Sequence, residues 1–200
     1  FPIRSMRFHK FQALGNDFLI VHESQLPPGV SLGHLTRKIC DRHFGIGADG
    51  VEILLERAKS GADVELRLFN ADGTETAISG NGTRCVAAYC YLCLSFPSPE
   101  IKVATGAGIK TVFIRDRTPD GGRFAMDMGK AVLESEGIPV DLPSPLDRVI
   151  AERLEIDGQM VEFTATSMGN PHCTIFVPDF ETIDWRSLGA SIERNSIFPE

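Results

Sequence analysis

The spacing of apolar residues divides the chain into many short strands and three helices. Residues 64–69 alternate strictly between apolar and polar side chains, which predicts a strand with one buried face. Leu32 and Ile39 recur at helical spacing behind Ser31, a residue suited to cap a helix that runs to about residue 43. Further strands are expected at residues 6–11, 18–21, 51–56, 101–103, 109–114, 124–128, 161–165 and 174–177, and a short helix at residues 185–193.

Residues 83–94 are apolar on almost every side of a predicted helix. Such a helix must be buried, so we expect it inside a layer of strands with Val86, Tyr89, Cys90 and Cys93 mostly covered. Cys90 and Cys93 have C-x-x-C spacing, but no His or second Cys pair follows at zinc spacing. The pattern therefore favours core packing of these two thiols.

One weak internal repeat indicates a duplicated fold. Residues 14–16 (Leu-Gly-Asn) and residues 168–170 (Met-Gly-Asn) each place a Gly-Asn turn shortly before an apolar, β-branched stretch. Residues 119–122 are the best domain boundary, which predicts a first domain at 6–122 and a partial second domain at 123–200. Met6 is a candidate first residue, and residues 1–5 are then expected to be a remnant outside the fold.

Composition and charge narrow the class of protein. Hydrophobic residues make up 42% of the chain and charged residues 24%, values that exclude a disordered chain, a collagen and a coiled coil. A net charge of −7 argues against a nucleic-acid partner, and no apolar run reaches the ~18 residues that a membrane span needs. The odd count of five Cys and the lack of an apolar leader predict reduced thiols in a soluble, cytoplasmic protein.

Two glycine-rich loops are candidates for chemistry. Residues 45–50 match G-x-G-x-x-G, but a helix precedes the loop and a strand follows it, the reverse of a dinucleotide site. Residues 79–82 (Ser-Gly-Asn-Gly) open the buried helix, so backbone N–H groups there can bind a carboxylate or phosphate. The alternative is that Ser79 is only the N-cap of this helix. The spacing leaves both interpretations open.

Other polar residues could complete a site or be structural. Asn70 lies in a turn that can place its amide beside the start of the buried helix. Asn170 and His172 bring an amide and an imidazole to a strand edge, although a lone His is more often structural. Arg84 and Cys85 follow the glycine loop and can equally be structural.

Five segments together resemble the diaminopimelate epimerase family. They are residues 14–18 (LGNDF), 43–49 (HFGIGAD), 69–73 (FNADG), 79–85 (SGNGTRC) and 167–172 (SMGNPH), in the family's order. The resemblance implies an α/β (α+β-type) fold of two pseudo-symmetric domains, each a curved mixed sheet around a central helix, with the second incomplete. It also implies a PLP-independent isomerase that interconverts LL- and meso-2,6-diaminopimelate by two-base α-proton transfer, for lysine and peptidoglycan precursor synthesis.

The resemblance assigns roles to single residues. Ser79 takes the position of a catalytic Cys, and the family's second catalytic Cys lies in a continuation expected beyond residue 200. The expected partner is a small-molecule amino-acid substrate, a homodimer is an expected assembly, and neither cofactor nor metal is expected. The residues that the resemblance places in substrate binding are Asn16, Asn70, Gly80, Asn81, Gly82, Asn170 and His172.

The serine raises a chemical question. A thiol has a reference pKa of ~8.5, whereas a hydroxyl is nearer the 15.7 of water, so Ser79 acts as a base only with strong activation. Ser79 is either a natural variant or an engineered replacement of the catalytic Cys. In either case we expect the enzyme activity of this chain to be impaired. The alternatives are a related epimerase or racemase of another amino acid, or a catalytically impaired protein that still binds substrate.

Overall fold

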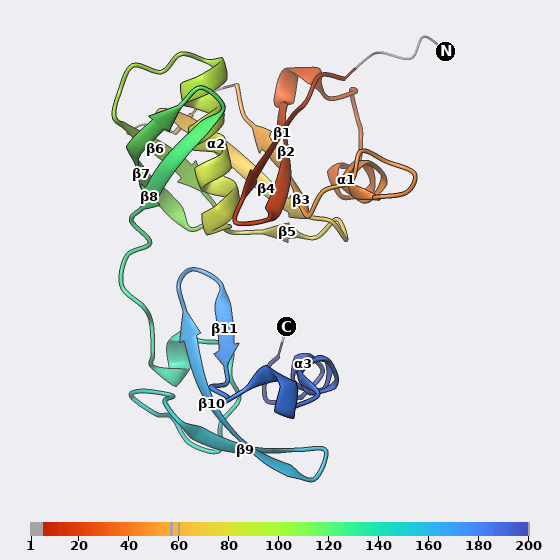
Figure 1. The fold of residues 1–200 in the computed structure, drawn as a ribbon, viewed down its shortest axis with the longest axis vertical. Helices are drawn as coiled ribbons and strands as arrows, with labels where there is room; N and C mark the ends of the chain where they lie inside the picture. Colours follow the sequence, from red (N-terminus) through yellow and green to blue (C-terminus); the bar gives the residue numbers. More distant parts are fainter. Residues whose placement is uncertain (1–5, 57, 60, 200) are drawn as a thin grey trace. The chain divides into compact units, whose positions relative to one another are not determined.

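A computed structural model describes residues 6–56, 58–59 and 61–199 of the chain (Figure 1). The chain divides into two compact units, Phe1–Met128 and Gly129–Glu200. The proposed remnant at residues 1–5 lies outside the described residues. Within the described part of the chain, no helix has the length and hydropathy that a membrane span requires.

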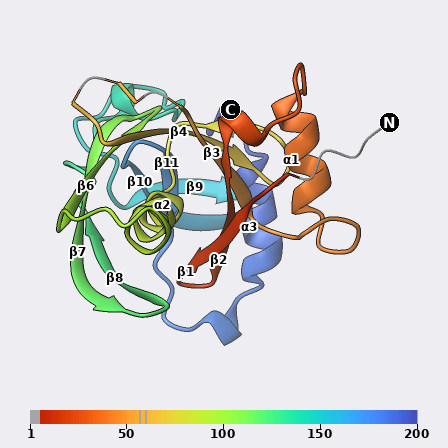
Figure 2. The same ribbon diagram turned by 90° about the horizontal axis from the view of Figure 1, so that it is seen from above.

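The first unit is a mixed sheet that curls around helix α2 (Gly80–Cys93), as Figure 2 shows. The sheet runs in the order β1-β2-β3-β4-β6-β7-β8, with β5 paired to β4. Pairs β2/β3 and β4/β6 are parallel, and the remaining pairs are antiparallel. The strands are β1 (His9–Ala13), β2 (Asn16–His22), β3 (Gly50–Leu54), β4 (Val64–Asn70), β5 (Glu75–Thr76), β6 (Glu100–Thr105), β7 (Gly108–Thr118) and β8 (Gly121–Met126).

Helix α2 is buried, as its apolar sequence predicts. Val86, Tyr89 and Cys90 are at most 3% exposed, and they pack against apolar side chains of β2, β4, β6 and β7. The expectation for Cys93 was wrong, because this residue ends the helix and is exposed, with its Sγ 3.8 Å from His9 Nδ1. Burial of the helix therefore fades in its last turn.

Helix α1 (Leu32–Cys40) covers the other face of the sheet, so β3 is buried on both sides. It ends before residue 43 because the glycine-rich loop folds back on it: the N–H groups of Ile46 and Gly47 both donate to the Ile39 carbonyl. A Cβ at Gly45 would lie 2.3 Å from the Lys38 carbonyl oxygen, which explains the glycine. The loop with the G-x-G-x-x-G pattern therefore packs against the end of α1.

The proposed boundary at residues 119–122 is a hairpin turn. Strands β7 and β8 pair from Val112↔Met126 to Thr118↔Gly121, so the chain continues in the first unit through this turn. The division into units falls after Met128. The Pro, Asp and Gly residues at 119–122 are typical of a tight turn as well as of a linker. The pairing of β8 with β7 shows that here they form a turn.

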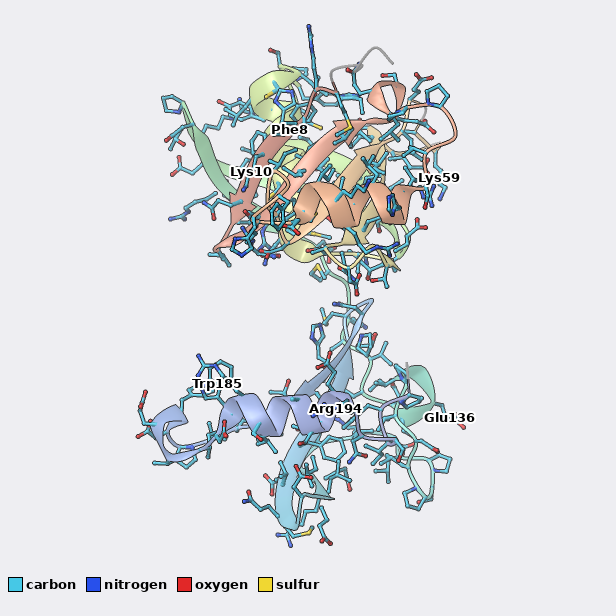
Figure 3. The ribbon with its side chains drawn as sticks, turned by 90° about the vertical axis from the view of Figure 1, so that its right-hand side faces the viewer. Phe8, Lys10, Lys59, Glu136, Trp185 and Arg194 are labelled. Carbon is cyan, nitrogen blue, oxygen red and sulfur yellow. The ribbon has the colours of Figure 1, made fainter. Side chains whose placement is uncertain are left out.

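The second unit holds the three-stranded sheet β11-β10-β9 and helix α3 (Trp185–Glu193), which has the predicted bounds (Figure 3). The strands are β9 (Glu152–Ile156), β10 (Gln159–Ser167) and β11 (Pro171–Thr174), and the short 3₁₀ turns of the chain are Glu23–Gln25, Ser135–Gly137 and Phe180–Thr182. The strand expected at 174–177 instead begins at Pro171, directly after the turn, where it pairs with β10.

The two Gly-Asn turns share a left-handed glycine but differ in length: two residues separate the paired Ala13 and Asn16, and three separate Ser167 and Pro171. Gly15 and Gly169 have φ values of 84° and 106°, in the left-handed region that glycine tolerates best. Each turn joins two antiparallel strands, β1 to β2 and β10 to β11. The fold-class prediction is confirmed: a curved mixed sheet surrounds a central helix, and a second, smaller sheet follows.

Candidate active site

Ser79 is the N-cap of α2. Its Oγ accepts a hydrogen bond from the Gly82 N–H at 3.1 Å, and its carbonyl oxygen accepts from the Thr83 N–H at 2.9 Å. The first N–H groups of a helix have no partner within the helix, which leaves those of Gly80 and Asn81 directed out of its positive end. The capping role of Ser79 is therefore confirmed, and it is compatible with an anion bound by the next two residues, which stays a prediction.

A directional chain of amide hydrogen bonds connects this helix start to β2 and β3. Asn81 Nδ2 donates to Asn16 Oδ1 at 3.3 Å, and Asn16 Nδ2 donates to Asp49 Oδ2 at 2.9 Å. Arg84 in turn donates to Asn81 Oδ1. Two of the predicted binding residues, Asn16 and Asn81, thus lie together beside Ser79, and Arg84 fixes the orientation of the Asn81 amide.

Charged residues that the sequence analysis did not select hold the far end of this chain. Arg42 donates to Asp17 Oδ1 at 2.7 Å and to Asp49 Oδ1 at 2.8 Å, and Lys10 lies 3.0 Å from Asp17 (Figure 3 labels Lys10). The hydrogen bond from Arg42 is the main cause that lowers the pKa of Asp17, with Lys10 adding to it. Both aspartates lie in segments that resemble the family, residues 14–18 and 43–49, and this was the sequence signal that could have identified them.

Asn70 reaches the same region through its backbone. It ends β4 opposite Gly50, and the N–H of the next residue, Ala71, donates to the Asp49 carbonyl at 3.0 Å. Its side chain turns into its own loop, where Nδ2 donates to Thr74 Oγ1 at 3.1 Å. The structure therefore places Asn70 at the edge of the cluster, with its amide bonded within the turn.

Asn170 and His172 belong to the second unit. Asn170 closes the turn between β10 and β11, where its carbonyl accepts from the Met168 N–H at 3.2 Å. His172 pairs with Thr166 across the hairpin and is exposed. Their proposed binding roles stay predictions.

The least expected residue near the helix start is Glu52. It lies in the middle of β3, opposite Ile20 of β2 and Leu68 of β4, and it is 0% exposed. Neither carboxyl oxygen has a hydrogen-bond partner among the described residues. Burial in this apolar setting disfavours the charged form and raises the pKa of Glu52 to about 8.

Glu52 lies directly against the glycine loop. A Cβ placed on Gly82 would be 1.8 Å from Glu52 Oε1, so only glycine fits there while the carboxyl holds its position. Gly82 is buried, and its N–H is the one that Ser79 Oγ accepts. The buried carboxyl of Glu52 therefore lies against the Cα of Gly82, and the hydroxyl oxygen of Ser79 accepts from the N–H of the same residue.

Two other features bear on what this site can hold. A hollow of about 920 Å³ lies along the flank of α2 between β1 and the β7–β8 hairpin, and its lining includes Arg84 and Cys85 but not residues 79–82. Among the described residues, no group of three or more His, Cys, Asp or Glu is arranged to hold a metal ion. The helix start therefore combines free N–H groups with a hydroxyl and a buried carboxyl beside them.

The Glu52 carboxyl should make the stability of the first unit depend on pH. The unfolded group ionises near pH 4.3, whereas the folded group keeps its proton to about pH 8. Its contribution is fully present below the lower value and is lost as pH rises through the higher one, at about 1.4 kcal/mol per pH unit. We expect Glu52→Gln to remove this slope, measured by urea unfolding between pH 5 and pH 8 with the signal of Tyr89 and Tyr91 on α2.

Glu75→Gln is the matched control for this measurement. Glu75 is paired with Arg67 at 2.7 Å, which lowers the pKa of Glu75 below the tested range. Its replacement should leave the slope between pH 5 and pH 8 intact. Equal slopes in the parent and in Glu52→Gln would contradict the burial of a protonated carboxyl in β3.

The chain is similar to known epimerases over nearly its whole length. The family model described as Diaminopimelate epimerase matches residues 8–134. The chain is 40% identical over 196 residues to the diaminopimelate epimerase of Desulfitobacterium hafniense, and 42% identical over 199 residues to that of Pelotomaculum thermopropionicum. Each alignment covers 97% of the chain and 68% of the relative.

Solved structures share the fold at lower identity. A hydroxyproline epimerase from Agrobacterium vitis, solved with bound trans-4-hydroxy-L-proline, superposes with a TM-score of 0.64 at 17% identity over 94% of this chain and 54% of its own. A methylitaconate-delta-isomerase superposes with a TM-score of 0.53 at 14% identity, over 85% of this chain and 52% of its own. The chain thus spans about half the length of these structures.

Proposed function

The chain belongs to the diaminopimelate epimerase family, and from that premise we propose that its protein interconverts LL- and meso-2,6-diaminopimelate without a cofactor. The reaction removes the proton of one α-carbon and returns a proton to the opposite face. The α-C–H group is a very weak acid, so the negative charge that develops on the substrate when the proton leaves must be stabilised in the site. The product is a precursor for lysine and peptidoglycan synthesis.

The observation that carries the proposal is the start of α2. The N–H groups of Gly80 and Asn81 are directed out of the positive end of a 14-residue helix, where an α-carboxylate is stabilised together with the charge that develops on it. Ser79 is partly exposed beside them and takes the position of the acid/base group on one face of the α-carbon. The Asn16–Asn81 amide pair, fixed by Asp49 and Arg84, orients the bound amino acid.

The remaining proposed residues follow from the same family assignment. Asn70 contributes from the end of β4, and Asn170 and His172 contribute from the second unit. The two compact units are proposed as the two halves of the epimerase, with the boundary after Met128 in place of the one that the sequence predicts between residues 122 and 123.

Exchange of the α-proton with solvent tests this function. The full-length protein, incubated with LL-diaminopimelate in D₂O, should incorporate deuterium at one α-carbon and form the meso isomer, as measured by NMR and chiral chromatography. Proline and trans-4-hydroxy-L-proline serve as competing substrates in the same assay. Exchange only into one of these would assign the site to another amino acid, and no exchange into any of the three would overturn the proposal.

A further inference from the structure

Ser79 needs an accessory group to act as an acid and base. A hydroxyl without help is too weak an acid, whereas an efficient proton-transfer group has a pKa near the working pH. On α2, the nearest ionisable side chains do not supply one: burial raises the pKa of Cys85 to about 12, and Arg84 is a cation that donates to Asn81. The only carboxyl that reaches the helix start from the core is that of Glu52, among the residues the structure describes.

The geometry brings Glu52 and Ser79 to one residue. Ser79 Oγ accepts from the Gly82 N–H at 3.1 Å, and Glu52 Oε1 lies so close to the Cα of Gly82 that a Cβ there would be 1.8 Å away. The hydroxyl proton of Ser79 is not used by this cap, because Oγ acts only as the acceptor. The two Glu52 oxygens are likewise unused among the described residues.

We propose that Glu52 is the proton store of the active site and exchanges protons with the substrate through the hydroxyl of Ser79. In one direction the α-C–H bond breaks, its proton bonds to Ser79 Oγ, and the Ser79 O–H proton passes to a Glu52 carboxylate oxygen. In the other direction the Glu52 carboxylic acid returns a proton to Oγ while the hydroxyl proton passes to the α-carbon. Because the two side chains share no hydrogen bond among the described residues, a water molecule carries the proton between them.

The surroundings of Glu52 suit a group that must gain and lose a proton. Ile20 of β2 and Leu68 of β4 flank it, Phe18 packs beside Gly82, and all three are apolar. Its titratable neighbour on α2 is Cys85, which stays a neutral thiol, and no cation among the described residues pairs with the Glu52 carboxyl. The pKa of about 8 that burial produces gives both protonation states near neutral pH.

The relay rests on the proposed function, and a double-mutant cycle in the full-length protein tests it. Glu52→Gln keeps the side-chain shape but cannot take up a proton. In the Ser79 background it should slow deuterium incorporation from the Ser79 face by about 100-fold or more, the usual contribution of an acid/base group. In a Ser79→Cys background it should slow exchange only a few-fold, because a thiol with a reference pKa of ~8.5 needs no proton store.

The two backgrounds separate a relay from a structural role. A purely structural Glu52 would give the same loss with Ser79 and with Cys at this position, and that result would overturn the relay. The pH profile gives a second readout: the ionisation near pH 8 in the parent should disappear in Glu52→Gln.

A measurement without turnover keeps the relay distinct from the proposed function. The carbonyl stretch of the protonated Glu52 carboxyl, assigned by its loss in Glu52→Gln, is followed by infrared spectroscopy against pH. Ser79→Ala should shift both its frequency and its titration midpoint, because the hydroxyl that the relay couples to the carboxyl is lost. An unchanged band in Ser79→Ala would overturn the relay even if the parent is active, and a shifted band would support it even if diaminopimelate is not the substrate.

Discussion

A Ser79→Asn protein is expected to fold with α2 fully capped and to lose α-proton exchange on the Ser79 face. Asn is as good an N-cap as Ser, so its side-chain oxygen accepts the hydrogen bond that the Gly82 N–H donates to Ser79 Oγ, without loss of stability. An amide neither gives nor accepts a proton near neutral pH. The exchange rate from this face should therefore fall by a factor of about 10²–10⁴.

Ser79→Ala is the companion variant. It removes the cap as well as the hydroxyl, and it should cost about 1 kcal/mol of the free energy of unfolding in addition to the lost exchange. Deuterium incorporation into each stereoisomer and urea unfolding of the same preparations give both quantities. Exchange at the parent rate in Ser79→Asn would show that Ser79 is only a helix cap.

Gly82→Ala is expected to destabilise the first unit more than any other single-methyl change at the helix start. The added Cβ would lie 1.8 Å from Glu52 Oε1 and 3.4 Å from Phe18 Cε1. Glu52 is 0% exposed, so its carboxyl moves aside only if the apolar side chains around it repack. Overpacking of this kind costs about 1–3 kcal/mol, measured as a lower midpoint in urea.

Two further variants decide the cause of this loss. A Cβ at Gly80 would lie 3.6 Å from Met128 Sδ, an ordinary contact, so Gly80→Ala should leave stability unchanged or raise it by up to about 1 kcal/mol. Removing the opposing carboxyl, in Gly82→Ala/Glu52→Ala, should recover much of the loss, because the new methyl group then has space. A loss that the second change does not reduce would mean that the backbone at Gly82, not Glu52, excludes the methyl group.

Local sequence patterns predicted most elements because their causes are local. The apolar helix Gly80–Cys93, the alternating strand β4 and the turn at Gly15 each follow from residues close together in the chain. The strand at Pro171–Thr174 was misplaced because β-branched residues favour 174–177, whereas pairing with β10 starts at the turn. Strand propensity depends on what lies across the sheet, and a single segment does not contain that information.

The site was predicted only in part for the same reason. Ser79 and Asn81 lie within one loop, so their motif is visible in the chain. The bonds of Arg42 to Asp17 and Asp49 depend on the parallel pairing of β2 and β3, which the sequence does not state. Glu52 was missed because a lone acid between apolar neighbours in a strand suggests a side chain on an exposed face. Only the order of the strands in the sheet shows that this face lies against α2.

The different burial of the cysteines means that the order of their alkylation reports how the two units unfold. Cys40, Cys85 and Cys90 are buried in the first unit, and Cys93 is exposed at the end of α2. Cys173, partly covered, is in the second unit. An alkylating reagent should therefore modify Cys93 first and reach Cys173 when the small sheet opens. It should reach Cys85 and Cys90 only when α2 leaves the curled sheet, and Cys40 only when α1 leaves the other face. Mass spectrometry of the modified peptides would time each event in one sample.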